Sequence, residues 1–203
     1  MPTASLCVLF SIAVAFSPYA PFFSSSTGTT PAVDPHVFVK DPTATVGVGP
    51  QSIAHADGYR PALIQSDPAG SPLFNAHGAP LGLTLGQWLG ATGSVDLETI
   101  NANAQRATVR FAGLSPYGAY SVFVHPAGQD ETAFIPLDGA GVGNTFVADA
   151  GGSASLSVLV SPPLVSGSAI VVVFHSDGLT HGLDFGAVGI TSHIQLIAFP
   201  LKR

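Results

Sequence analysis

The chain has 203 residues, of which 46% are hydrophobic and only 9% are charged, and its formal net charge is −6. Ordinary globular chains carry about 25% charged residues. Because only six lysines and arginines are present, the sequence lacks the basic stripe of a nucleic-acid-binding protein and a polybasic membrane patch. The 23 glycines and 17 prolines mark many turns, which is typical of a β-rich fold with short strands.

Residues 1–23 are expected to be a signal peptide or an N-terminal anchor. Their apolar run, from Leu6 to Phe16, has the length of a signal-peptide core rather than of a transmembrane span. No lysine or arginine precedes the run, and Pro21 weakens the cleavage pattern near Ala20. A removed signal, a retained anchor and an apolar N-terminal strand are therefore three alternatives. A signal or an anchor would place the protein outside the cytoplasm, secreted or in the cell envelope, and a membrane would be a partner only through an anchor.

Cysteine usage narrows the chemistry further. The only cysteine, Cys7, lies inside the apolar run, and the only methionine is Met1. If the run is removed, disulfides, iron–sulfur clusters, cysteine zinc sites and thiolate nucleophiles are excluded. A blue-copper centre is excluded as well, because it needs a cysteine thiolate and usually an axial methionine.

Residues 24–50 are rich in Ser, Thr, Gly and Pro and have no long hydrophobic period. They are expected to form a linker or surface arm, in which His36 is solvated. Apolar runs and turn signals become dense from Gln51 onward, so residues 51–203 are expected to form one domain.

A short helix is expected near residues 84–91. Thr84 is a candidate N-cap, and Leu85, Trp88 and Leu89 fall on one face at positions i, i+3 and i+4. Two glycines oppose the helix, each by about 1 kcal/mol relative to alanine. Trp88 is expected to be a core anchor rather than a platform for sugar stacking, because tryptophan is buried on average.

Short strands are expected in the rest of the chain. In residues 153–160 serines alternate with apolar residues, which is the period of a half-buried antiparallel strand, whereas residues 169–174 are apolar on both faces and predict a central strand. About eight such strands favour an all-β fold, an antiparallel β-sandwich of immunoglobulin-like or jelly-roll-like type. The strands are expected near residues 95–100, 107–113, 119–125, 132–137, 144–149, 154–160, 168–175 and 188–199.

Residues 113–122 read GLSPYGAYSV. This segment resembles the Leu-x-Pro…Tyr entry to a strand in immunoglobulin-like and fibronectin type III-like domains, although the Cys…Trp…Cys pattern is missing. In those domains the tyrosine hydroxyl bonds back to the upstream backbone as a tyrosine corner, and Tyr120 is the matching residue. The resemblance implies a sandwich and nothing about function.

The candidate functional site lies in the last part of the chain. His175 ends an apolar strand, His181 follows in a glycine-rich connection, and His193 lies in the next apolar run. Strand alternation places His175 and His193 on semi-polar faces near the rim of one sheet. If the connection folds back, the three imidazoles converge on Cu²⁺ or Zn²⁺, with Asp177 or Asp184 as a fourth ligand or hydrogen-bond acceptor. The alternative is a long hairpin loop whose histidines hydrogen-bond the backbone and hold the turn.

Other chemistry has weaker support. The loops at residues 138–144 and 149–152 combine an aspartate with glycines, but neither has the ligand spacing of a calcium loop. The glycines at 139–143 lack the lysine of a phosphate-binding loop. The sequence contains neither a Gly-x-Ser-x-Gly nor a His-Glu-x-x-His motif.

Three functions therefore stay open. The first is an exported, non-catalytic binding domain that holds copper or zinc through His175, His181, His193 and Asp177, with no organic cofactor. The second is a cell-surface adhesion or structural module without metal, whose partner is another surface protein. The third is a metal-dependent enzyme in which the same histidines activate water or oxygen.

Overall fold

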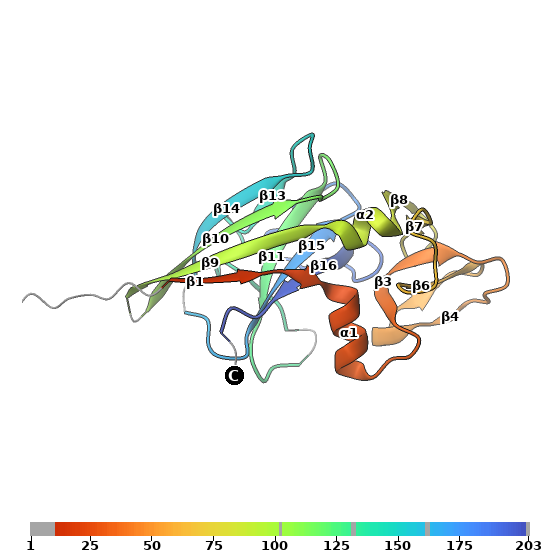
Figure 1. Ribbon diagram of the computed structural model, residues 1–203, viewed down its shortest axis with the longest axis horizontal. Helices are drawn as coiled ribbons and strands as arrows, with labels where there is room; N and C mark the ends of the chain where they lie inside the picture. The colour runs from red at the N-terminus through yellow and green to blue at the C-terminus, as the bar shows by residue number, and fades with distance from the viewer. Residues whose placement is uncertain (1–10, 102, 131–132, 161–162, 202–203) are drawn as a thin grey trace, which may run out of the picture.

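The computed structural model describes residues 11–101, 103–130, 133–160 and 163–201. Two antiparallel sheets face one another as a sandwich (Figure 1), which confirms the expected all-β architecture. The four-stranded sheet has the order β1-β9-β10-β14, with β1 (Ser11–Ala15), β9 (Thr92–Asn101), β10 (Ala104–Ala112) and β14 (Ala154–Val160). The six-stranded sheet has the order β12-β11-β15-β16-β2, and β13 also pairs with β11. Its strands are β2 (Ser17–Pro18), β11 (Ala119–His125), β12 (Ile135–Pro136), β13 (Thr145–Val147), β15 (Ala169–His175) and β16 (Ser192–Ala198).

Strand alternation builds the core between the two sheets. In β14 the exposed Ser155, Ser157 and Leu159 alternate with Val158 and Val160, which are buried, as the serine pattern predicts. Equivalent side chains from β9 and β10 meet those of β11 and β15, and each buried valine or leucine stabilises the fold by about 1.5–3 kcal/mol. Every one of the eight expected strands overlaps a strand of this sandwich.

Strand β15 is buried on both faces, as its apolar sequence predicts. Val172 and Phe174 point into the core between the sheets. Val171 and Val173 point to the outer face, where they join a second apolar cluster with Phe23 of helix α1 (Tyr19–Thr27). The six-stranded sheet is therefore a middle layer rather than an outer wall.

The expected short helix is present as α2 (Leu85–Gly90). Thr84 is its N-cap: the Thr84 hydroxyl accepts from the backbone N–H of Gln87 at 3.3 Å, and the Gln87 side chain accepts from the backbone N–H of Thr84 at 2.9 Å. This reciprocal capping box satisfies two donors that a helix start leaves unpaired. Trp88 is 1% exposed, which confirms it as a core anchor.

The segment before residue 51 differs from the expected linker. It contains β3 (Val33–Lys40), which is buried from Val33 to Val39 and is the second strand of a separate four-stranded sheet with the order β6-β3-β7-β8. Because β3 is covered on both sides, its sequence shows no alternation, and the compact fold begins before Gln51. The remaining elements of this lobe, at the right of Figure 1, are β4 (Gly47–Val48), the short 3₁₀ helix η1 (Pro50–Ser52), β5 (Ala54–His55), β6 (Tyr59–Leu63), β7 (Pro72–Phe74) and β8 (Pro80–Thr84).

The first described residues also belong to the fold. Strand β1 pairs with β9 along its whole length, from Ser11 opposite Glu98 to Ala15 opposite Ser94. Residues 11–15 are therefore a strand, which is one of the three alternatives for the N-terminal segment. That residues 1–23 are removed as a signal peptide stays a prediction. Cleavage near residue 23 would take away β1, β2 and half of α1. None of the helices in the described ranges has the length and hydrophobicity of a membrane span.

The tyrosine corner is formed as expected. The backbone N–H of Ser115 donates to the Tyr120 hydroxyl at 2.9 Å, and Tyr120 is fully buried with its ring stacked on Phe146.

We expect Tyr120→Phe to lower the free energy of unfolding by about 1 kcal/mol, because the Ser115 N–H then loses its acceptor. Urea denaturation measures the difference. Tyr117→Phe is the matched control, since Tyr117 is 73% exposed, and equal losses in the two variants would contradict the role of the corner.

Candidate functional site

His175 is held at the end of β15 by two serine hydroxyls. Its Nε2 lies 2.9 Å from the Ser121 hydroxyl, and its Nδ1 lies 3.1 Å from the Ser192 hydroxyl. The single hydrogen of Ser121 is donated to the carbonyl oxygen of His181 at 2.9 Å, so Nε2 of His175 must be the donor to Ser121. Nδ1 then accepts from Ser192, and the neutral ring uses both nitrogens inside the protein.

The connection after β15 folds back onto His175, as the sequence suggested. The His181 ring stacks on the His175 ring with centroids 4.5 Å apart, and its Nε2 lies 2.8 Å from Asp177 Oδ2. The other Asp177 oxygen accepts from the backbone N–H of Leu179, and Gly178 has a φ of 75°, so the Asp-Gly pair also makes the turn.

His193 lies on the opposite face of the sheet from His175. It is paired with Phe174 across the two strands, and the centroids of the two rings are 6.1 Å apart. Phe174 points into the core between the sheets, so His193 lies on that side as well. The register of β15 and β16 shifts between Val172 and Val173, which leaves Gln195 as an extra, bulged residue. The bulge resets the alternation in β16, so simple alternation from Ile197 does not give the face on which His193 lies.

The four predicted metal ligands are therefore brought together only in part. His175, His181 and Asp177 are neighbours, whereas His193 donates from Nδ1 to the carbonyl oxygen of His36 at 2.7 Å and has Nε2 3.1 Å from the Ser176 hydroxyl. Across the described ranges, no group of three His, Cys, Asp or Glu side chains is placed to hold a metal ion. The two stacked rings hydrogen-bond to the side chains of Ser121, Ser192 and Asp177, and metal binding by them stays a prediction.

The two acid-and-glycine loops are organised by their own aspartates. Asp138 accepts from four successive backbone N–H groups, those of residues 140–143, and Asp149 accepts from Gly151 and Ser153. These hydrogen bonds lower the pKa of Asp138 against the effect of its burial. Both carboxylates therefore serve to hold the backbone of their own turns.

His36 was expected to be solvated, but it is 1% exposed and links β3 to β16. The backbone N–H of Ile194 donates to His36 Nδ1 at 3.0 Å, so the ring carries its hydrogen on Nε2 and donates it to the Gln51 side-chain oxygen at 2.7 Å. The Gln51 amide in turn donates to the Tyr19 hydroxyl at 3.1 Å, and the Tyr19 and His36 rings stack. Burial lowers the pKa of His36 to about 3.

Asp34 is a second buried polar group in the same strand. It is fully buried, and its oxygens accept from the His36 backbone N–H at 2.8 Å and from the Trp88 indole N–H at 2.7 Å. Burial raises the pKa of Asp34 to about 6, because these neutral donors only partly replace water around the charge.

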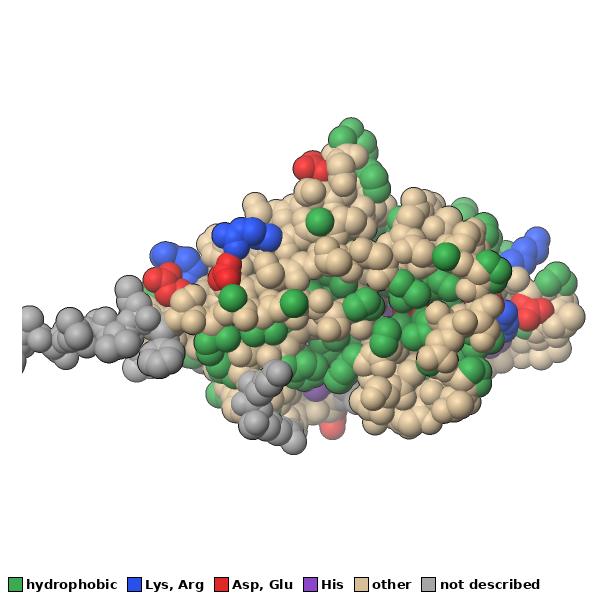
Figure 2. Space-filling view, in the orientation of Figure 1, with side chains coloured by type: hydrophobic (Ala, Val, Ile, Leu, Met, Phe, Trp, Pro, Cys, Tyr) green, Lys and Arg blue, Asp and Glu red, His purple; other side chains and the backbone are tan. Residues whose placement is uncertain are grey.

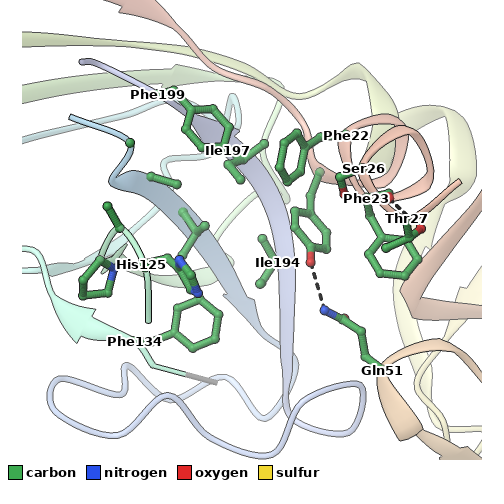
Figure 3. A pocket seen from close by; sticks show the side chains of 17 residues that line it. Phe22, Phe23, Ser26, Thr27, Gln51, His125, Phe134, Ile194, Ile197 and Phe199 are labelled. Atoms are coloured by element: carbon green, nitrogen blue, oxygen red, sulfur yellow. Dashed lines mark hydrogen bonds between the residues drawn. The ribbon is translucent and has the colours of Figure 1, made fainter. Parts of the chain in front are cut away.

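Tyr19 and Gln51 border a pocket between α1 and the outer face of the six-stranded sheet (Figure 3). The pocket has a volume of about 290 Å³. Its apolar walls are Phe22, Phe23, Phe134, Ala169, Val171, Ile194, Ile197 and Phe199, and its polar rim is Tyr19, Ser26, Thr27, Gln51 and His125. A concave apolar site with a few converging polar groups is the usual form of a small-molecule site.

The backbone at the polar end of the pocket is strained. Gln51 and Ser52 both have left-handed φ values, 55° and 58°, which cost non-glycine residues about 1–2 kcal/mol each. Such strain gathers where a side chain must be held in a fixed place. Here it presents the Gln51 amide to Tyr19, His36 and the pocket together.

No Asp, Glu, Lys or Arg lines the pocket among the residues that the structure describes. His125 is the titratable ring at its edge, and its Nε2 donates to the carbonyl oxygen of Asp130 at 3.1 Å. The arrangement can therefore bind a neutral, mostly apolar molecule and offer it hydrogen bonds. Sequence reasoning missed this site because one of its walls, helix α1, lies in a segment that was expected to be a signal and a linker, so nothing indicated that it covers β15 and β16.

Comparisons with known proteins add no identity to this geometry. No protein-family model matches the chain, and no curated protein is significantly similar to it.

The buried histidines make stability depend on pH. Burial lowers the pKa values of His36, His175 and His193 from 6.5 to about 3, 4 and 4. Unfolding in this range takes up protons on three rings, so the stability that they contribute above pH 6.5 is lost as the pH falls toward 4. Asp34 acts in the opposite direction, because its raised pKa of about 6 makes the folded state bind a proton that the unfolded carboxyl, with a pKa of 3.8, does not yet hold.

Three histidines outweigh one aspartate, so we expect stability to fall by on the order of 2 kcal/mol per pH unit between pH 6 and pH 4. Thermal unfolding followed by circular dichroism measures the slope. In His193→Asn the amide keeps the donor to the His36 carbonyl but cannot be protonated, and the slope should become flatter. The exposed His77→Asn is the control, and an unchanged slope in both variants would contradict the assignment to buried histidines.

Proposed function

We propose that this protein is a non-catalytic binding domain that holds a small, uncharged and mostly apolar molecule in the pocket between α1 and the six-stranded sheet. Export with removal of residues 1–23 is kept apart from this proposal, because it would take Tyr19, Phe22 and Phe23 away from the pocket. The observation that carries the proposal is the pocket itself, about 290 Å³ in volume, with aromatic and aliphatic walls and the Gln51 amide at one end.

The donors and acceptors around the pocket suit a neutral ligand. Gln51 uses its oxygen to accept from His36 and one amide hydrogen to donate to Tyr19, and a primary amide has a second hydrogen and a second lone pair to offer. Ser26 and Thr27 donate their hydroxyl hydrogens to the Phe23 carbonyl. The Thr27 oxygen then accepts from the Thr29 hydroxyl at 2.6 Å, and a hydroxyl oxygen has two lone pairs, so Thr27 keeps one to offer. A charged ligand would have to leave water without an opposite charge in the described lining, which is costly.

Binding of N-phenyl-1-naphthylamine, a neutral apolar dye whose fluorescence rises when it leaves water, tests the proposal. We expect saturable binding that Ala127→Trp weakens by about tenfold or more, a loss near 1.4 kcal/mol, because Ala127 lines the pocket from a half-exposed loop and the indole fills the space. Gln129→Trp is the matched control, since Gln129 lies two residues further along the same loop, exposed and outside the pocket. Equal binding by both variants would refute the location, and the absence of dye binding to the unchanged protein would refute the pocket as a ligand site.

A second candidate function is transition-metal binding at His175, His181 and Asp177. The observation in its favour is that these three side chains meet, with the His181 imidazole against a carboxylate. The hydrogen bonds of His175 to Ser121 and Ser192 stand against it, because a metal would have to replace one of them.

Equilibrium dialysis with Cu²⁺ or Zn²⁺ tests the metal site. One tightly bound ion that is lost in His181→Ala and kept in His77→Ala supports it. No stoichiometric ion would refute it.

A further inference from the structure

A second hollow adjoins the pocket on the other side of Phe22. It has a volume of about 610 Å³ and lies between β1, the start of α1 and the end of β16. Its own lining includes Val14, Ala15, Pro18, Pro21 and Ala198, and it shares Phe22, Ile197 and Phe199 with the pocket. Figure 2 shows hydrophobic side chains gathered below β1 and beside α1, where this hollow lies.

The two spaces meet at a pair of aromatic rings. The Phe22 and Phe199 rings are in contact, with centroids 5.2 Å apart, and Phe22 is 36% exposed. Figure 3 shows both rings and Ile197 at one end of the pocket and Gln51 at the opposite end. A molecule that hydrogen-bonds to Gln51 and extends along the pocket therefore has its apolar end at the Phe22–Phe199 pair, which also lines the second hollow.

We propose that the two hollows form one binding site for an elongated, uncharged lipid, with a hydroxyl or amide head at Gln51 and a single unbranched alkyl chain that passes Phe22 and Phe199 to lie against β1. This inference rests on the proposed function, because it takes the first hollow as the ligand site. Neither lining contains an Asp, Glu, Lys or Arg in the parts of the chain that the structure describes, so the head is neutral.

The shape of the joined space selects the chain. A flexible alkyl chain can pass between two phenyl rings that turn slightly, whereas a rigid fused-ring system cannot. The polar groups sit at one end only, since the described lining of the second hollow offers a single side-chain hydroxyl, that of Ser17, beside apolar residues. Each methylene that enters the second hollow leaves water, and this raises affinity by about fourfold per methylene.

Competition against N-phenyl-1-naphthylamine with straight-chain 1-alkanols, from 1-hexanol to 1-tetradecanol, tests the inference. In the unchanged protein we expect affinity to rise with each methylene through most of the series. Ala15 is exposed and lines the second hollow, so the indole of Ala15→Trp should fill that hollow. In this variant affinity should stop rising at the alkanol length that fills the first pocket. The binding of 1-hexanol and of the dye should stay the same. Ala13→Trp is the matched control, since Ala13 is exposed on the same strand and borders neither hollow, and it should follow the unchanged protein.

The outcomes separate this inference from the proposed function. If affinity in the unchanged protein stops rising at the same chain length as in Ala15→Trp, the second hollow is not used and the inference fails, although the pocket still binds short ligands. If neither the alkanols nor the dye bind, the proposed function fails together with this inference.

Competition at pH 8 tests whether the head group is neutral. Tetradecanoate should compete at least about tenfold more weakly than 1-tetradecanol, because its carboxylate must leave water. Equal competition would overturn a neutral head.

Discussion

Both faces of the six-stranded sheet are apolar and must be covered. One face of β15 packs against the four-stranded sheet through Val172 and Phe174, and the other requires a second cover over Val171 and Val173. Helix α1 supplies that cover only in part. The pocket is the space that remains between helix and sheet, so the same apolar pattern that makes β15 a central strand also creates the candidate binding site.

Neutral hydrogen bonding holds the segments around this site in place. His36 joins β3 to the edge of β16 by accepting from Ile194, and His193 returns a hydrogen bond to the His36 backbone. Both rings are buried in their neutral form, and Asp34 beside them has only neutral donors. Such a network stabilises the fold as long as every member keeps its partner, and it links the Gln51 end of the pocket to the core between the sheets.

Local rules were enough where a segment interacts mainly with its neighbours in sequence. The capping box at Thr84, the Asp138 turn and the Tyr120 corner each depend on residues within a few positions of one another, and all three are present. The alternation of β14 and the continuous apolar run of β15 likewise reported correctly how many faces of each strand are buried.

Contacts between distant segments decided the rest. The serine alternation and the apolar runs determined a β-sandwich, because a strand's side-chain period records its burial directly. The face that His193 occupies was decided by one bulged residue, Gln195, which resets the alternation and cannot be read from the period itself. Segments 11–40 carry no period that distinguishes a leader and linker from buried structure, and only their pairing with β9, β6 and β16 makes them part of the core. The pocket exists for the same reason: its two walls, α1 and the strands β15 and β16, lie more than a hundred residues apart and meet only in the folded chain.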